Sequence, residues 1–378
     1  MIEFLQNLLS DRLVQLVISG LVAFLMSVES IPVIINISRL KNLMDEPGER
    51  SSHSNRTPTL GGVAIFASIL IGYFLWENPD GGILINLSIV GLVVLFFLGV
   101  KDDILVLSPT KKMIFQIVSA ALLVVGADLR LDNFFGIFGI YQISYIPSFF
   151  LTIFVFIALI NAINLIDGID GLAGGIGMFA SVMFGAWFYL NEQYALACLA
   201  SSLSGALLGF LRFNFSRTSK IFMGDTGSLI VGFILTVFAI QFVHLNVTSR
   251  FDPNAYFSAP ILAIVILIVP IFDTLRVFSI RIMNRSSPFV GDRNHLHHIL
   301  VDLGLSHFQG SFILCIFSGA ATALFLMLDD HLDNTQSLLL LGALFVAYLG
   351  VCHGLKLRTI RTKNPQKLQN PTQEELVP

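Results

Sequence analysis

Long apolar runs are the feature of this sequence that most constrains its fold. A helix needs about 20 apolar residues to cross a bilayer, although shorter or tilted helices also span it. Such runs recur along a chain that has only 12% charged residues and a mean hydropathy of +0.80, too apolar for a soluble protein of 378 residues. We therefore predict an all-α polytopic membrane protein with about eleven transmembrane helices. They fall near residues 13–35, 61–76, 83–100, 113–128, 146–166, 174–190, 194–211, 227–244, 258–275, 309–328 and 335–353.

The Lys and Arg residues predict how these helices are oriented. Cytoplasmic loops of membrane proteins carry an excess of positive charge. If the N-terminus is outside, only Arg12, Arg130 and Arg250 of the 22 Lys and Arg residues face outward, and the other 19 face the cytoplasm. We therefore expect an external N-terminus and a cytoplasmic C-terminus.

A single transmembrane domain is expected over residues 1–355, with no room for a soluble domain. Residues 129–145 are predicted to form a short external hairpin. Residues 356–378 are polar and basic at first, so we expect a disordered cytoplasmic tail near anionic lipid. The cytoplasmic loops that hold the polar clusters are 36–60, 101–112, 164–173, 212–226 and 276–308.

One helix end departs from the apolar pattern. Asn161, Asn164 and Asp167 recur every three residues and share a helical face, and Asp170 follows Gly168, where the helix is expected to end. Polar groups at a membrane boundary cost free energy unless they pair, face water or hold a ligand. A solvated helix end would explain one such carboxylate but explains the whole group poorly. We interpret the stripe as part of a binding site.

Two adjacent carboxylates, Asp102 and Asp103, close the third predicted span, and Lys111 and Lys112 open the next. Neighbouring carboxylates repel, so one pKa rises unless a cation lies between them. Oxygen ligands of this kind suit Mg²⁺, which shares its coordination with substrate phosphates. A capped helix end beside ordinary inner-leaflet lysines is the alternative interpretation.

Two glycine-rich helix starts are candidate anion sites. Gly61 and Gly62 open the second span, and the alternative there is an ordinary solvated loop before a helix. The eighth span opens with Gly224, Asp225 and Thr226, where the positive end of the helix could face a phosphate or a metal-holding carboxylate. Alternatively, Asp225 or Thr226 only caps the helix.

The densest group of hydrogen-bond donors is Arg293, His295, His297 and His298. His295 and His298 would share a helical face and His297 would not, so we expect a loop or a helix start. Zinc is the alternative ion, but no Cys is near and the carboxylates suit a harder metal.

The remaining polar or reactive residues in the spans are expected to be structural. Asp273 and Arg276, three apart, are predicted to pair. The cysteines lie inside apolar runs without CxxC spacing, so neither a disulfide framework nor a thiolate metal site is expected.

Taken together, these motifs resemble one family, the polyprenyl-phosphate N-acetylhexosamine-1-phosphate transferases. The resemblance extends from Asp45 to His298 in the family's order, and eleven helices with an external N-terminus are also similar to that family. It is carried by Arg50, His53, Pro58, Gly61-Gly62, Asp102-Asp103, Asn164-Leu-Ile-Asp167-Gly-Ile-Asp170-Gly, Gly224-Asp225-Thr-Gly-Ser228, Pro288-Phe289, Asp292-Arg293 and His295-Leu-His297-His298.

The resemblance implies a function and a set of roles. A UDP-N-acetylhexosamine would donate its sugar 1-phosphate to undecaprenyl phosphate in the bacterial inner membrane, with UMP released. Asp225 and Asn164 would hold Mg²⁺, with Mn²⁺ as an alternative, and Asp102 and Asp103 would be catalytic. A homodimer is a further expectation. The residues implied to bind the nucleotide sugar and its phosphates are Arg50, His53, Asn161, Asn164, Asp167, Asp170, Arg293, His295, His297 and His298.

The roles of Asp102 and Asp103 have alternatives. One of them could be a covalent nucleophile or a base for the lipid phosphate. A phosphate monoester is already mostly dianionic at pH 7, so a base gains little. We therefore favour direct displacement, with both carboxylates positioning the lipid phosphate and the metal.

The subfamily and the class are also weighed against alternatives. His-x-His-His is similar to the GlcNAc-type branch, whereas the phospho-MurNAc-pentapeptide transferase of peptidoglycan synthesis resembles three consecutive histidines. Ser51 and Ser52 replace a lysine that is usual in the GlcNAc branch, which leaves the sugar open. A membrane transporter is the rival from another class, but its charges would be expected near mid-membrane.

Overall fold

The computed structural model describes residues 10–45, 56–76, 79–248, 255–285 and 294–363. Within these ranges nine helices are long and apolar enough to cross a membrane. They are α2 (Arg12–Leu40), α4 (Gly82–Leu105), α5 (Pro109–Gly126), α6 (Tyr145–Ile166), α7 (Leu172–Leu190), α8 (Tyr194–Asn214), α9 (Gly224–Thr248), α13 (His307–Leu328) and α14 (Asn334–Lys363).

Two further segments complete the set of apolar helices. α10 (Ala259–Ile266) and α11 (Ile268–Met283) follow each other with a bend of 81° between them, and only together are they long enough to cross a membrane; α3 (Gly61–Tyr73) is a shorter apolar helix. Each predicted run coincides with one of these helices, so the prediction of an all-α polytopic membrane protein is confirmed. The direction in which the bundle crosses the membrane stays a prediction.

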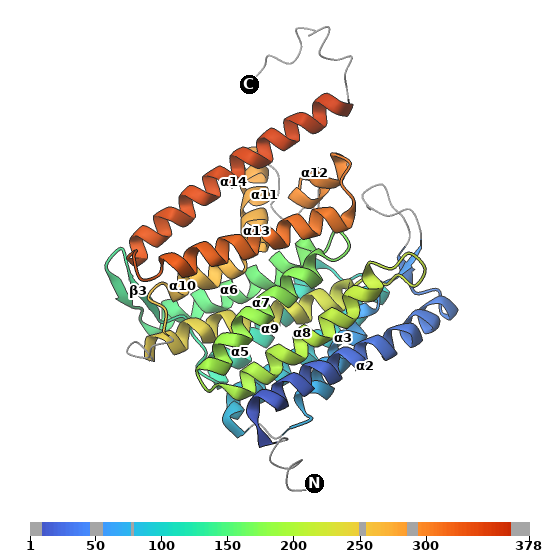
Figure 1. Cartoon of the computed structure of the whole chain (residues 1–378), viewed down its shortest axis with the longest axis horizontal. Coiled ribbons are helices and arrows are strands. Elements are labelled where there is room, and N and C mark those ends of the chain that lie inside the picture. The colour runs from blue at the N-terminus through green and yellow to red at the C-terminus, as the bar shows by residue number, and fades with distance from the viewer. Residues whose placement is uncertain (1–9, 46–55, 77–78, 249–254, 286–293, 364–378) are drawn as a thin grey trace.

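Helix α9 lies at the centre of the bundle (Figure 1). It packs against α3, α4, α6, α7 and α10. A helix that is apolar on all sides is buried on all sides, and α9 has this composition. Its Phe233 ring lies 5.6 Å from that of Phe156 on α6, and its Phe242 ring lies 4.7 Å from that of Trp187 on α7. These ring contacts hold the middle and the later half of α9 against its neighbours.

The hairpin predicted between the fourth and fifth spans is present at one end of the bundle. Strand β3 (Asn133–Ile137) pairs antiparallel with β4 (Ile140–Gln142). The hairpin contacts α9 and α14, and Asn334 at the start of α14 donates a hydrogen bond to the carbonyl of Phe135 (2.8 Å). Figure 1 places this hairpin and the short helix α12 (Leu296–Asp302) at opposite ends of the molecule.

The end that carries α12 also collects the predicted loop clusters. The ends of α4 and α6 and the starts of α5 and α9 meet there, together with the short antiparallel pair of β1 (Met44–Asp45) and β2 (Thr57–Pro58). A turn of 3₁₀ helix (Pro79–Gly81) connects α3 and α4. Helix α14 continues to Lys363, so the first part of the predicted disordered tail is helical, and the rest lies outside the described residues.

Candidate active site

The glycine pair that opens α3 serves helix packing. The amides of Gly61 and Gly62 donate hydrogen bonds to the carbonyls of Phe222 (3.0 Å) and Met223 (2.9 Å) in the loop before α9. A Cβ atom on Gly62 would lie 2.1 Å from the backbone nitrogen of Gly227, so only glycine permits this approach. Because both amides are already used, this helix start offers no anion site.

The start of α9 holds a carboxylate that comes from another helix. Asp103, near the end of α4, accepts hydrogen bonds from the amides of Asp225 (2.7 Å) and Thr226 (3.1 Å), and from the Thr226 hydroxyl (2.5 Å). The positive end of the helix stabilises this negative charge. Gly99 allows the approach, because a Cβ atom there would lie 2.4 Å from the Cα of Thr226. The predicted anion site at α9 is therefore occupied by Asp103.

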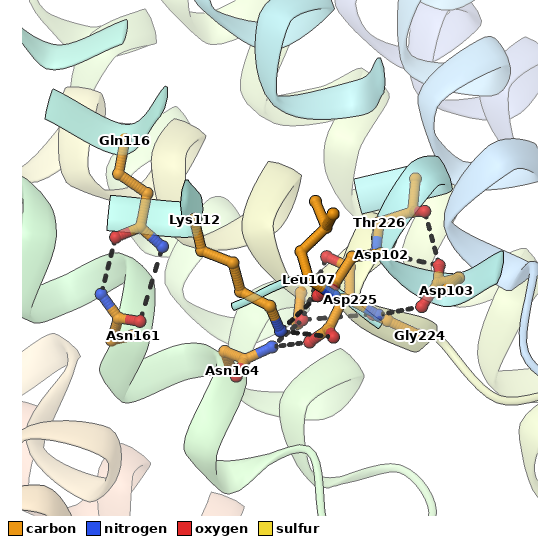
Figure 2. A network of polar contacts seen from close by, with 11 residues as sticks. Asp102, Asp103, Leu107, Lys112, Gln116, Asn161, Asn164, Gly224, Asp225 and Thr226 are labelled. Atoms are coloured by element: carbon orange, nitrogen blue, oxygen red, sulfur yellow. Dashed lines mark hydrogen bonds and ion pairs between the residues drawn. The ribbon is translucent and has the colours of Figure 1, made fainter. Parts of the chain in front are cut away.

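Beside this capped helix start, one ammonium group joins two carboxylates (Figure 2). Lys112 of α5 forms ion pairs with Asp102 of α4 and with Asp225 of α9, the latter at 2.9 Å. Asn164 of α6 donates from Nδ2 to Asp225 (2.5 Å) and to the Ser228 hydroxyl (2.8 Å). Four helices thus contribute to one cluster, and the side chains of Lys112 and Asp225 remain about a quarter to a third exposed.

The charges of this cluster favour an additional cation. Asp102, Asp103 and Asp225 bring three carboxylates, and Lys112 brings one ammonium. Among the described residues no group of three His, Cys, Asp or Glu side chains is placed to hold a metal alone. Mg²⁺, however, is normally held by one or two carboxylates, with water and substrate phosphates completing its shell. The carboxylates of Asp102 and Asp225, which already share one cation, fit that requirement.

The loop between α6 and α7 places its two carboxylates in different surroundings. Asp170 accepts hydrogen bonds from Lys220 (2.7 Å) and His307 (2.8 Å), so it joins the loop to α13 and to the segment before α9. Burial opposes ionisation of Asp170, but these two partners lower its pKa. Burial raises the pKa of Asp167 well above its usual range, and the charge of Asp225 adds to this effect. The charge of the cluster thus opposes ionisation of Asp167.

Asn161 lies one helical turn before Asn164 and has a different partner. Its Nδ2 donates to Oε1 of Gln116 on α5 (2.8 Å) and to the carbonyl of Ile157 (2.7 Å). Figure 2 shows this amide pair beside the ion cluster. The pair joins α5 to α6 and so supports the helices that carry Lys112 and Asn164. The predicted contact of Asn161 with substrate stays a prediction.

The histidine segment forms the start of α12, as predicted. His295 is the N-cap residue, and its Nδ1 lies 2.8 Å from the carboxylate of Asp273. His297 is 1% exposed and packs against the α6–α7 loop, where a Cβ atom on Gly168 would lie 2.2 Å from its Nε2. Burial, together with the nearby charge of His298, lowers the pKa of His297 to about 3. His297 is therefore neutral near pH 7.

Three predicted site residues, Arg50, His53 and Arg293, lie outside the described residues. Three other residues join the site without having been predicted there: Lys112, Lys220 and His307. The signal for Lys112 was partial, because adjacent carboxylates call for a cation, but Lys112 lies between Asp102 and Asp225 and does not pair with Asp103. Lys220 and His307 had no such signal, since their partner Asp170 is remote in sequence.

Comparisons with known proteins give the family of this chain. The family model described as Glycosyl transferase family 4 matches residues 85–243, which run from within α4 to within α9 and contain the whole ion cluster. The chain belongs to this family of sugar-phosphate transferases, because relatives with such names are 30% and 31% identical to it over 79% and 81% of its length.

The similar proteins carry closely related names. The chain is 30% identical to a probable undecaprenyl-phosphate N-acetylglucosaminyl 1-phosphate transferase of Bacillus subtilis, over 79% of this chain and 81% of the relative. It is 31% identical to the undecaprenyl-phosphate alpha-N-acetylglucosaminyl 1-phosphate transferase of Haemophilus influenzae, over 81% and 84%. The enzyme of the same name from Escherichia coli K12 is 27% identical, over 84% and 85%.

Proposed function

We propose that this protein transfers N-acetylhexosamine 1-phosphate from a UDP-sugar, such as UDP-N-acetylglucosamine, to undecaprenyl phosphate. An oxygen of the lipid phosphate attacks the sugar-side phosphorus of the donor and forms a new P–O bond. The bond from that phosphorus to the bridging oxygen breaks, and UMP leaves. The lipid-linked pyrophosphoryl sugar would begin the synthesis of a cell-surface polysaccharide, O-antigen lipopolysaccharide being one such product.

The single observation that carries this proposal is the cluster of Asp102, Lys112, Asn164 and Asp225 beside the capped start of α9. The reaction brings two polyanions together, so its catalyst must neutralise charge and align the reacting groups. A site drawn from four helix ends, partly exposed and charged with both signs, meets that need. The names of the relatives support undecaprenyl phosphate as the acceptor.

Magnesium is the cofactor that the donor set suits. Asp225 and Asn164 would hold Mg²⁺, and Asp102 would lie beside it, because its carboxylate shares the Lys112 ammonium with Asp225. When bound, the ion would supply charge neutralisation at the pyrophosphate. Mn²⁺ suits the same oxygen ligands.

Asp102 and Asp103 act by positioning in this proposal. Asp103 is held by three donors at the start of α9, and Asp102 is buried against Lys112, with its other oxygen accepting the amide of Leu107 (2.6 Å). Groups held in this way are poorly placed to attack phosphorus, which favours a single displacement. A phospho-aspartyl adduct trapped at Asp102 would contradict it.

The remaining roles follow the same site. Asp167 would orient the donor, with Asp170 holding its loop through Lys220 and His307. His297, His298 and Arg293 would contact phosphate oxygens. The distribution of Lys and Arg supports a cytoplasmic active site, where UDP-sugars are made. A homodimer remains a prediction of the family resemblance.

The test is a transfer assay on purified protein, both in detergent and reconstituted into lipid vesicles. Radiolabelled UDP-sugars are supplied one at a time with undecaprenyl phosphate and Mg²⁺, and the label that enters the lipid phase is counted. A hexosamine 1-phosphate transferase labels the lipid from UDP-N-acetylhexosamine and releases UMP. Labelling only from UDP-MurNAc-pentapeptide would indicate the peptidoglycan enzyme, and uptake into vesicles without UMP release would indicate a transporter.

A further inference from the structure

Asp273 of α11 is a buried carboxylate that joins three helices. Its Oδ1 accepts hydrogen bonds from Nη2 of Arg276 (2.8 Å), from the amide of Leu296 (3.0 Å) and from the hydroxyl of Tyr348 on α14 (3.3 Å). Its Oδ2 faces Nδ1 of His295 at 2.8 Å. The predicted pairing of Asp273 with Arg276 is confirmed, but it is only part of this network.

Both members of the ion pair also hold the start of α12 and the residue Asn294 that precedes it. Arg276 donates to the carbonyl of Asn294, and Asp273 accepts the amide of Leu296. A buried ion pair adds little stability by itself, because desolvation offsets the attraction between the charges. The network is therefore better explained by what it positions, and the element that it positions is the start of α12.

The carboxylate also sets the orientation of the His295 ring. An ionised carboxylate only accepts hydrogen bonds, so Nδ1 of His295 carries the proton that it donates to Asp273. The His295 side chain is 5% exposed, and its ring lies parallel to that of His297, with centroids 5.6 Å apart. Asp273 thus holds the His295 ring, and the His295 ring packs against the ring of His297.

His297 is the residue of this segment that lacks a partner. Both of its ring nitrogens are buried without a hydrogen bond to any described residue. Buried polar groups in native proteins are nearly always paired, and the exceptions often mark functional positions. The Nε2 of His297 lies against Gly168 in the α6–α7 loop. This is the loop that carries Asp167 and Asp170, the two carboxylates proposed to serve the nucleotide-sugar donor.

We propose that Asp273 is a positioning residue for the donor site: it fixes His295 and the first turn of α12, and so places the His297 ring against the α6–α7 loop. The proposal rests on the proposed function, since a group of the nucleotide sugar is what would pair with His297. Asp273 itself acts through the protein, because both of its carboxylate oxygens already have protein partners.

The test compares Asp273→Asn with Asp329→Asn in the full-length protein. Asp329 is a matched control, because it is also buried and accepts amide hydrogen bonds, but at the hairpin end of the bundle. We expect Asp273→Asn to lower kcat/KM for the UDP-sugar about 100-fold, as displacements of about 1 Å do. Asp329→Asn should leave kcat/KM near the wild-type value.

A double-mutant cycle distinguishes positioning from a general loss of structure. If Asp273 acts through His295, adding Asp273→Asn to His295→Gln should cost little further activity, because coupled residues are not additive. Independent, multiplicative losses, or an unchanged kcat/KM in folded Asp273→Asn protein, would overturn the proposal.

Hydrogen–deuterium exchange gives a readout that needs no activity. Asp273→Asn should increase exchange of the amides of residues 296–302, whereas Asp329→Asn should not. If the wild-type protein transfers no sugar phosphate, the proposed function fails. The exchange at α12 then still decides whether Asp273 positions that helix, and unchanged exchange would refute it.

Discussion

At both ends of the bundle a carboxylate accepts backbone amides at the start of a helix, but only one of these two places forms the candidate site. At the site end, Asp103 from α4 accepts two amides and a hydroxyl at the start of α9. At the hairpin end, Asp329 after α13 accepts the amides of Phe257 (2.9 Å) and Ser258 (3.0 Å) and the Ser258 hydroxyl, just before α10. Each carboxylate caps a helix that belongs to another part of the chain.

The surroundings of the two caps differ. Asp102 and Asp225 lie next to Asp103, and both form ion pairs with the ammonium group of Lys112. The side chains of Lys112 and Asp225 are partly exposed. The neighbours of Asp329 in the chain, Asp330 and Asp333, are exposed to solvent, and Asp333 caps α14. A capping carboxylate alone therefore gives only structure. A site arises where further charges are held close together at the capped end.

The largest effect is expected at Asp225. Asp225→Asn keeps the size of the side chain but removes a charge that pairs with Lys112 and is proposed to hold the metal. Transfer of label into the lipid phase should fall about 10³-fold or more, since electrostatic contributions to catalysis reach that size. Asp329→Asn is the control and should retain transfer. If Asp225→Asn transferred label at nearly the wild-type rate, the proposal that Asp225 holds the metal would be wrong.

The second prediction compares the caps directly. Asp103→Asn and Asp329→Asn should lower the free energy of unfolding by similar amounts, about 1 to 2 kcal/mol, because each weakens the cap of a helix start. Only Asp103→Asn should also lower kcat, by about 100-fold, since it shifts the start of α9 that carries Asp225. Thermal unfolding and initial rates on the same preparations check both parts. Equal loss of activity in the two variants would show that the caps are not distinguished by function.

The third prediction concerns the ammonium that the two site carboxylates share. Without metal, Lys112→Met should lower the free energy of unfolding by about 1 to 3 kcal/mol, because Asp102 and Asp225 lose their common partner. Adding Mg²⁺ should recover most of this loss, since the ion can take the place of the ammonium. The loss and its recovery are measured by comparing melting temperatures of the variant and the wild type in EDTA and in Mg²⁺.

Lys111→Met is the matched control for this experiment. Lys111 is the neighbouring residue, its side chain is exposed, and no ion pair of Lys111 is found among the described residues. Its melting temperature should not depend on Mg²⁺ more than that of the wild type. If Mg²⁺ does not restore the melting temperature of Lys112→Met, then the metal does not bind where the Lys112 ammonium lies in the wild type.

The fold could be predicted from the sequence because the bilayer imposes it. Apolar length alone identified the nine long apolar helices of the described residues, and it also found the bent pair of α10 and α11 and the short apolar helix α3. The motifs also identified the end of the bundle at which the site lies, because Asp102, Asn164 and Asp225 all fall at helix ends on one side.

The partners of the site residues could not be predicted in the same way. Asp102 and Asp103 are adjacent in sequence, yet successive helical positions point about 100° apart, so one meets Lys112 and the other caps α9. Which distant residue meets each carboxylate depends on helix packing, as the contact of Asp170 with His307 at the start of α13 illustrates. Patterns within one segment carry no information about that choice.

The smallest predicted effect is a difference between two ion pairs in acid. The pKa of Asp170 is lowered by its partners, so its ionised form contributes stability above the pKa of the unfolded chain, about 3.9. That contribution should fade as the pH falls through the lowered pKa. The difference in unfolding free energy between wild type and Asp170→Asn, about 1 kcal/mol at neutral pH, should therefore shrink below about pH 4.

Asp128, which pairs with Arg130 near the hairpin, provides the comparison. Its pKa is also lowered, but its side chain is 68% exposed, so water screens the pair. Asp128→Asn should change the unfolding free energy less than Asp170→Asn at neutral pH and hardly at all in acid. Thermal unfolding of the three proteins from pH 7 to pH 3 decides the matter, and an equal or larger effect at Asp128 would mean that burial at the site end adds nothing to the strength of its ion pairs.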